Sequence, residues 1–408
     1  MAMGKAWSRV SVVIGFVAMA SQGAAQQAAD ATPPDARAAP VVKSLRIAAA
    51  QPKRRSIDWH ITDPGAVLER VDQSLAELEP MIHKAGAAGC AAIAFPEDTL
   101  GLLNWEAAHH DRLKDVLPTA VGRMLDRFGR AAAAHRMYLV ACNDAIEADG
   151  SLYNTAFLLG RDGKEIGRYH KVNLPIQEQN RARGDRFPVF PTPELGGVGM
   201  LICYDMVFPE ATRCLALAGA DVVFIPTLGG AAVTDDPELD RAAFRTRAVE
   251  NFVYLVVAQR SGGSLIISPQ GKVLAEAKGT DALAIAEITP NGGREGGDSA
   301  NHQRDMRARL FRERSPTAFG LLVDPRPPVL AKVPEATTPA QAIRVFAGIL
   351  TVGEEQFRQA SALAREGKTD EAIRAFERLI REYPDSWIDR EARLRLARLR
   401  APGSSRPR

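Results

Sequence analysis

The stretch "GMLICYDMVFPEATRC", residues Gly199 to Cys214, places a cysteine where an apolar run ends and a helix-like segment begins. The run "GVGMLIC" predicts a buried strand, and Pro209 followed by Glu210 is typical of the first turn of a helix. Polar residues at strand ends leave the core and face a crevice, where α/β proteins collect their ligand sites. Cys203 is therefore either a nucleophile or a small core residue, and taken alone it is more often the latter.

The composition limits the classes of protein that are possible. The chain has 408 residues, 46% hydrophobic and 25% charged, which suits one large or two modest globular domains. A net charge of +3 indicates neither a strongly acidic nor a strongly basic partner, so nucleic-acid binding has no support. We expect no metal and no cofactor, because the cysteine spacing matches no zinc site. Disulfide bonding of three of the four cysteines stays open: Cys90, Cys142 and Cys214.

The N-terminal segment has the pattern of a secretory signal peptide. Lys5 and Arg9 precede an apolar run, Val10 to Ala20, and small residues follow up to Ala25. We therefore predict a signal peptide over residues 1–25 and a secreted or periplasmic protein. The run is shorter than the roughly 20 apolar residues that span a bilayer, so no stable membrane span is expected after cleavage. An uncleaved N-terminal membrane anchor is the alternative.

The rest of the chain divides by composition. The main body alternates short apolar runs with amphipathic segments, which predicts an α/β layered domain. Two hairpin signals, "GRDGKEIG" and "SPQGKV", indicate mixed rather than wholly parallel sheets. The expected boundaries are a disordered spacer at 26–43, the body at 44–322, a Pro-rich linker at 323–340, a helical tail at 341–400 and a disordered end at 401–408.

The expected strands of the body are bounded by turn residues, and an amphipathic helix separates the first two. That helix spans Gly65 to Gly89, with valine and leucine on one face. The expected strands lie at Ser44–Gln51, Cys90–Glu97, Met137–Cys142, Leu152–Gly160, Gly197–Cys203, Asp221–Thr227, Asn251–Gln259, Ser264–Pro269 and Ala282–Ile288.

Polar residues at two other strand ends bear on the interpretation of Cys203. Glu97 closes "AIAFPE", and Lys171 follows "GRYH"; each alone is typical of a solvated side chain. In order and local sequence, however, "FPE", "YHKVNLP" and "LICYDMVFPEATRCLALAGADVVFIPT" resemble the carbon-nitrogen hydrolase, or nitrilase, superfamily. The resemblance covers Ser44 to Leu322 and is closest to the amidase-like branch. It implies a four-layer αββα sandwich with a Glu-Lys-Cys triad.

The residue types of this triad suit amide hydrolysis. A cysteine attacks as the thiolate, and we expect the Lys171 cation and the helix N-terminus to favour that form of Cys203. Lys171 and the backbone N–H of Tyr204 would stabilise the oxyanion that forms on attack. Glu97 would carry the proton from the thiol to the leaving amine and would later activate water against the thioester.

Further residues are expected to support the triad. The resemblance places a second glutamate, which positions substrate and lysine, at Glu178 in "NLPIQEQNRARG". We predict that Tyr204 and Met206 border the pocket, and that Asp205 makes structural hydrogen bonds in the turn. Arg181 is interpreted as a solvated loop residue rather than an anion-binding group.

Two loops and one thiol complete the expectations for the body. The loops Leu100–Leu117 and Gln177–Phe187 are expected to shape the substrate pocket. Cys214 shares a helical face with small and apolar residues, so core packing is the preferred interpretation.

The tail is a separate feature. "EEQFRQASALAREGKTDEAIRAFERLIREYPDS" resembles one tetratricopeptide helix pair, and an Arg-rich helix follows it. One pair cannot bury its own apolar faces, since about three repeats are normally needed for stability. We therefore expect the tail to dock on the body, on another subunit or on a protein partner.

Two functional hypotheses remain. The first is an exported thiol hydrolase that cleaves a non-peptide C–N bond of a small amide or N-carbamoyl compound through a cysteine thioester, releasing ammonia or an amine. Its alternative within the same class is a nitrilase that converts a nitrile to an acid. The second hypothesis is a catalytically silent exported protein that interacts through its tail. The presence of Glu97, Lys171 and Cys203 favours the first. Relatives of this kind commonly pair, so we expect a homo-oligomer, a dimer or larger.

Overall fold

The computed structural model describes residues 44–229, 237–260, 262–290, 306–333, 338, 354–383 and 387–400. The predicted signal peptide (1–25), the spacer (26–43) and the C-terminal end (401–408) lie outside these residues. None of the helices in the described ranges is long and apolar enough to cross a membrane.

Two six-stranded mixed sheets form the centre of the body. The first has the order β12-β1-β2-β3-β4-β5 and the second has the order β11-β10-β9-β8-β7-β6. The strands of the first sheet are β1 (Leu45–Gln51), β2 (Cys90–Ala94), β3 (Tyr138–Ile146), β4 (Leu152–Leu159), β5 (Glu165–His170) and β12 (Ala282–Ile288). Those of the second are β6 (Val189–Thr192), β7 (Gly196–Met200), β8 (Val222–Thr227), β9 (Tyr254–Gln259), β10 (Leu265–Ile267) and β11 (Val273–Glu276).

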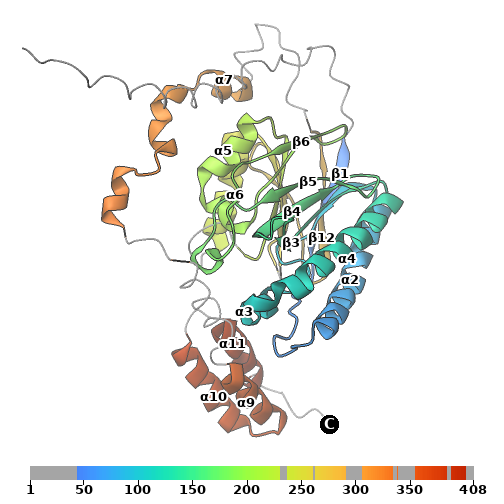
Figure 1. Cartoon of the computed structure of the whole chain (residues 1–408), viewed down its shortest axis with the longest axis vertical. Helices are drawn as coiled ribbons and strands as arrows, with labels where there is room; N and C mark the ends of the chain where they lie inside the picture. The colour runs from blue at the N-terminus through green and yellow to red at the C-terminus, as the bar shows by residue number, and fades with distance from the viewer. Residues whose placement is uncertain are drawn as a thin grey trace, which may run out of the picture. The chain divides into compact units, whose positions relative to one another are not determined.

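Helices cover the outer face of each sheet, which confirms the four-layer αββα sandwich (Figure 1). Helices α2 (Pro64–Ala87) and α4 (Leu113–Ala134) bury apolar side chains against the first sheet in one core cluster. A second cluster fills the space between the two sheets and continues under α5 (Pro209–Leu217) and α6 (Pro237–Asn251). Helix α7 (Met306–Arg312) follows β12 along the chain, and short 3₁₀ helices occupy Pro316–Val323 and Pro328–Lys332.

The sequence signals of α2 act as predicted. Asp63 caps the helix, since its Oδ2 accepts a hydrogen bond from the Ala66 N–H at 2.8 Å, and Pro64 fills the first helical position. Val67, Val71 and other apolar residues of one face are buried. This face holds the helix on the sheet through burial rather than through intrinsic propensity.

Both predicted hairpins are present. The β4–β5 turn contains Gly163 at φ +79° and the β10–β11 turn contains Gly271 at φ +73°, a region that side chains rarely adopt. A Cβ on Gly163 would also overlap the backbone carbonyl of Gly129 in α4, so this turn requires glycine twice over.

The strand directions explain where the polar residues gather. β1, β2 and β3 are parallel, and β4 is antiparallel to both β3 and β5, so β5 runs in the same direction as β3. In the second sheet β7, β8 and β9 are parallel. Glu97, Lys171 and Cys203 therefore all follow the carboxyl ends of strands, as ligand sites in α/β sheets do.

Two local predictions differ from the structure. The segment 100–117 is largely helical rather than a loop, because it contains α3 (Leu103–Ala108), a 3₁₀ turn and the start of α4. Buried Trp105 fixes it, with its indole N–H donating to the Ile61 carbonyl at 2.8 Å. β6 was not expected; it is a short edge strand that contains Pro191, a residue that edge strands tolerate but that weakens a strand signal.

The C-terminal extension is helical, as predicted. It consists of α9 (Glu354–Arg365), α10 (Thr369–Glu382) and α11 (Trp387–Arg400). Phe357 and Phe376 pack edge to face with ring centroids 5.7 Å apart, and Ile388 and Ala392 of α11 join the same small cluster. The third helix thus buries apolar surface that the helix pair alone would expose. Docking of this extension on another surface stays a prediction.

Candidate active site

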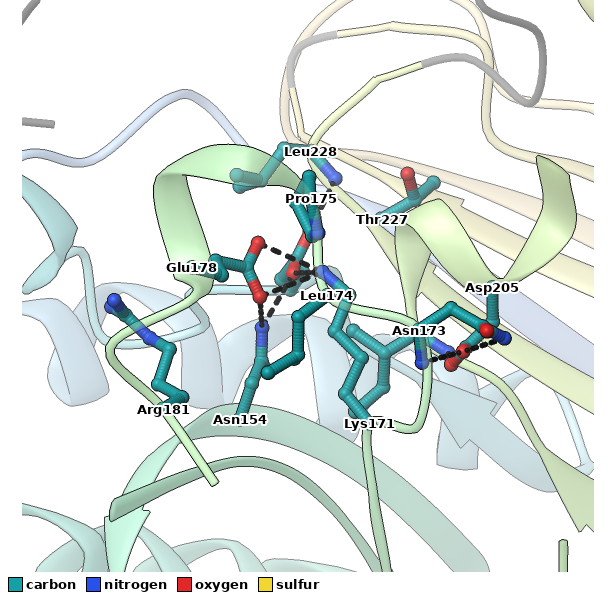
Figure 2. A network of polar contacts seen from close by, with 12 residues as sticks. Asn154, Lys171, Asn173, Leu174, Pro175, Glu178, Arg181, Asp205, Thr227 and Leu228 are labelled. Atoms are coloured by element: carbon teal, nitrogen blue, oxygen red, sulfur yellow. Dashed lines mark hydrogen bonds and ion pairs between the residues drawn. The ribbon is translucent and has the colours of Figure 1, made fainter. Parts of the chain in front are cut away.

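Lys171 lies at the centre of a buried cluster and its side chain is fully enclosed (Figure 2). Its Nζ donates to Glu97 Oε1 at 3.0 Å and to Glu178 Oε1 and Oε2 at 2.9 and 3.0 Å. Burial alone would lower the pKa of Lys171, but the two carboxylates outweigh it and raise that pKa well above the ordinary lysine value. The lysine is therefore a cation at neutral pH.

Glu97 follows β2 and is 2% exposed. Besides Lys171, its carboxylate accepts from Asn154 Nδ2 at 2.7 Å and from the Leu228 N–H at 3.2 Å. Leu228 follows β8 of the second sheet, so Glu97 joins the carboxyl ends of both sheets. One carboxylate with three donors in a dry site is held in a single orientation.

Glu178 lies in the 3₁₀ turn Ile176–Glu178 and reaches the same lysine. The sequence placed a second glutamate at this position, and the structure brings it to Lys171. Burial raises the pKa of Glu178, while the Lys171 cation and Arg181 oppose that rise. Two carboxylates thus share one lysine in a site with almost no solvent.

Cys203 lies just beyond β7 in an unusual backbone conformation. Its φ is +45°, which a non-glycine residue rarely adopts. The turn is closed by the Asp205 N–H, which donates to the Ile202 carbonyl at 3.0 Å, and α5 begins at Pro209 as predicted. The strained turn places the half-buried side chain just beyond the end of the strand.

The pKa of the Cys203 thiol does not follow the sequence expectation. Burial raises it to about 12; the Glu97 charge adds to the rise, and Lys171 and a hydrogen bond with Thr227 only partly oppose it. The expectation of a lowered thiol pKa was wrong because it counted the lysine and the helix but neither desolvation nor the adjacent carboxylates. At neutral pH the thiol therefore carries its proton.

Asp205 connects the cysteine turn to the loop that carries Lys171. Its side chain is fully buried and accepts from the Ile202 N–H at 3.0 Å, from Tyr169 Oη at 2.6 Å and from the Asn173 N–H at 2.9 Å. Figure 2 shows Asp205 beside Asn173. The predicted structural role of Asp205 in the turn agrees with these contacts.

The two neighbours of Asp205 occupy different environments. Tyr204 is half-buried, and its ring meets Phe208 edge to face at 5.5 Å between centroids. Met206 is 1% exposed within the core cluster between the sheets, and its sulfur accepts from the Thr212 hydroxyl at 3.9 Å. The structure therefore places Met206 in the core, whereas the sequence prediction placed it at the pocket border.

Arg181 is buried, contrary to the expected solvated position. Its guanidinium donates through Nε to Asp144 Oδ2 at 2.8 Å, makes a second contact to the same oxygen through Nη2, and lies 3.4 Å from Glu106 Oε2. The sequence "QNRARG" is polar and predicted an exposed loop. The prediction was wrong because the partners of Arg181, Asp144 in β3 and Glu106 in α3, come from distant segments. Burial, followed by the charge of Asp144, raises the pKa of Glu106 well above its ordinary value.

One residue of the site was not foreseen. Asn154 on β4 bridges Glu97 and Glu178; it lies on the inward face of its strand with apolar Ala156, and a polar residue at such a position is a usable signal.

Cys214 is exposed, whereas the sequence predicted that it packs in the core. All four cysteines are unpaired with one another. Within the described ranges, no group of three or more His, Cys, Asp and Glu side chains is arranged to hold a metal ion.

The architecture and this buried Glu-Lys-Glu cluster beside a cysteine define a nitrilase-like fold. An amidase from Nesterenkonia sp. AN1 has a similar structure, with a TM-score of 0.50, 24% sequence identity, and coverage of 66% of this chain and 96% of that one. At this level of identity the likeness concerns the fold alone.

The sequence comparisons go further. The carbon-nitrogen hydrolase family profile matches residues 46–296, more than half of the chain, and a tetratricopeptide repeat profile matches residues 356–386. This chain belongs to the carbon-nitrogen hydrolase family and is a hydrolase that acts on carbon–nitrogen bonds.

Several curated relatives are similar to the body. The deaminated glutathione amidase of Synechocystis sp. is 31% identical over 245 residues, 54% of this chain and 87% of the relative. The omega-amidase of Homo sapiens is 28% identical over 229 residues, 51% of this chain and 79% of the relative. The nitrilase of Pyrococcus abyssi is 34% identical over 233 residues, 53% of this chain and 84% of the relative.

Proposed function

We propose that this hydrolase cleaves a non-peptide C–N bond of a small amide or N-carbamoyl compound through a thioester on Cys203, with Glu97 and Lys171 as its partners. The observation that carries the proposal is the buried contact of Lys171 with Glu97 beside the strained cysteine turn. Relatives with the names amidase and omega-amidase support the amide class of substrate.

In the acylation half, the thiol proton of Cys203 passes to the Glu97 carboxylate as the sulfur attacks the amide carbon. The π electrons of the carbonyl move onto oxygen, and Lys171 Nζ together with the Tyr204 N–H stabilises the resulting anion. Collapse of this intermediate re-forms the C=O bond and breaks the C–N bond. The leaving nitrogen takes the proton from Glu97, so ammonia or an amine departs and a thioester remains.

In the deacylation half, Glu97 takes a proton from water and the hydroxide attacks the thioester carbon. Collapse breaks the C–S bond, and the Cys203 sulfur regains its proton from Glu97 as the acid product leaves. The raised pKa of Cys203 supports this scheme, because a thiol that holds its proton to about pH 12 requires a base within the site. Glu97 is that base in the proposal.

Mass spectrometry of the protein with slowly hydrolysed amides tests this proposal, in parallel with ammonia release from a panel of primary amides and N-carbamoyl compounds. We expect an acyl adduct on Cys203 in the wild type and neither adduct nor ammonia with Cys203→Ala. Cys214→Ala is a matched control, because that thiol is exposed and lies outside the cluster. Undiminished ammonia release by Cys203→Ala would contradict the proposal.

Nitrile hydrolysis is the second candidate function, because a relative that is 34% identical carries the name nitrilase. The same thiol addition would convert a nitrile carbon to a thioimidate; water then adds to the thioimidate carbon and ammonia leaves, so a thioester remains. Including nitriles in the same panel separates the two: an amidase releases ammonia from amides only, whereas a nitrilase also releases it from nitriles.

We also propose that the protein is exported, on the basis of the signal-peptide pattern in residues 1–25. N-terminal sequencing of the protein recovered from the periplasmic or culture fraction tests this, with cleavage near Ala25 expected. An intact Met1 on a membrane-bound form would instead support the uncleaved anchor. The proposed homo-oligomer is tested by light scattering on the same sample.

A further inference from the structure

Asn154 is a buried amide that contacts both carboxylates of the site. It lies on β4 with 5% exposure, and its Nδ2 donates to Glu97 Oε1 at 2.7 Å and to Glu178 Oε2 at 3.2 Å. Figure 2 shows Asn154 reaching toward Glu178 and Lys171. The proposed reaction assigns no step to this amide, although no other described side chain donates to both glutamates except Lys171.

The other atoms of Asn154 are also engaged. The Cys142 thiol donates to Asn154 Oδ1 at 3.4 Å, and the Lys171 N–H donates to the backbone carbonyl of Asn154 at 2.9 Å. Since carboxylates only accept hydrogen bonds, the amide must present its NH₂ group to them and its oxygen to the thiol. The residue therefore holds Lys171 through the backbone and both glutamates through the side chain.

The electrostatics of the cluster explain why an amide suits this position. Glu97 and Glu178 share a single lysine, so two buried like charges face one opposite charge. A second cation would neutralise the cluster and weaken Glu97 as a base. An amide instead supplies two N–H donors without adding charge, and each donor stabilises an ionised carboxylate.

We propose that Asn154 is a positioning residue that fixes the orientation of the Glu97 carboxylate by bridging it to Glu178. This inference rests on the proposed function only through the role of Glu97 as base. It predicts that loss of the bridge leaves the Glu97 carboxylate poorly positioned, so proton transfer from the Cys203 thiol slows while substrate binding is retained.

The test compares Asn154→Ala and Asn154→Asp with Tyr153→Phe. Tyr153 is the adjacent residue of β4 and stacks on His170 at 4.1 Å, so its variant controls for disturbance of the strand. The two readouts are kcat and KM, measured separately for amide hydrolysis, and the rate of Cys203 alkylation by iodoacetamide.

We expect kcat to fall roughly 10- to 100-fold in both Asn154 variants while KM changes little, and Cys203 alkylation to slow by a similar factor, about the usual strength of a hydrogen bond to a charged group. The loss should be larger for Asn154→Asp, which adds a third carboxylate. Tyr153→Phe should keep the wild-type kcat and alkylation rate.

Wild-type kcat and alkylation rates, accompanied only by a lower melting temperature, would show a merely structural role and overturn the inference. The alkylation rate needs no turnover, so it still tests Asn154 if the wild type hydrolyses no amide and the proposed function fails. If Asn154→Asp does not fold, Asn154→Ser supplies the second variant, with the loss expected for Asn154→Ala.

Discussion

Two buried clusters in the body have the same combination of one basic and two acidic side chains but different chemistry. The first contains Lys171 between Glu97 and Glu178, and the second contains Arg181 between Asp144 and Glu106. In both, one cation serves two carboxylates in a site with almost no exposure. The turn 176–181 joins them, since the Arg181 N–H donates to the Glu178 carbonyl at 2.9 Å.

The difference lies in the geometry of the cation. The ammonium of Lys171 is a compact charge with three donors that can be redirected, and it lies beside a thiol. The guanidinium of Arg181 is a planar fork that holds Asp144 through two nitrogens and Asn180 through a third. The same combination of side chains therefore serves the proposed reaction in one cluster and anchors the turn that carries Glu178 in the other.

The largest effect is expected from removing the cation of the first cluster. Lys171→Met removes the proposed oxyanion donor and leaves two buried carboxylates together, so we expect kcat for amide hydrolysis to fall at least about 10²- to 10³-fold. Steady-state kinetics on the folded fraction measures this. Turnover within tenfold of the wild type would mean that the lysine is structural, as Arg181 is.

Glu97→Gln should separate the proposed role of the carboxylate as a base from the effect of its charge on the Cys203 thiol pKa. Turnover should be lost because the base is gone, yet the thiol pKa should fall below its wild-type value of about 12, since the Glu97 charge is the second cause of its rise after burial. Iodoacetamide alkylation across the alkaline range measures the thiol pKa. An unchanged or higher thiol pKa in this variant would contradict the assigned cause.

Breaking the second cluster should affect stability first. Arg181→Met leaves Asp144 and Glu106 buried without their cation, and removing one partner of a buried pair typically costs about 3–5 kcal/mol. Urea unfolding measures the loss. A smaller decrease in kcat is expected, because the turn that positions Glu178 loses its anchor. A variant with wild-type stability would show that the cluster is not an anchor.

The smallest expected effect is that of Glu106→Gln. Burial favours the protonated form of this carboxyl, and a glutamine N–H can donate to Asp144 in its place, so stability should change by less than about 1 kcal/mol at low pH. Because the folded-state pKa of Glu106 is raised, its contribution to stability is present below the ordinary value of 4.5 and is lost as pH rises through the folded-state pKa. Urea unfolding across pH should show this loss in the wild type and not in the variant; the same slope in both would refute the protonation assignment.

Local signals predicted much of the fold. The apolar runs, the capped α2 helix and the two glycine hairpins depend on residues near one another, and each was found where the sequence placed it. The short edge strand β6 and the helical segment at 103–117 were missed, because a proline and a mixed polar pattern obscure the periodicity of those segments.

By itself, the sequence determined that Glu97, Lys171 and Cys203 follow strand ends and that Glu178 belongs with them, since order and local pattern are properties of the chain. Only the tertiary structure decided that Arg181 is buried, that Asn154 bridges the glutamates, and that the Cys203 pKa rises rather than falls. The physical reason is that desolvation and charge coupling depend on everything that packs around a group. Lys171 and Glu97 are 74 residues apart in the sequence, and no local sequence pattern predicts a contact at that separation.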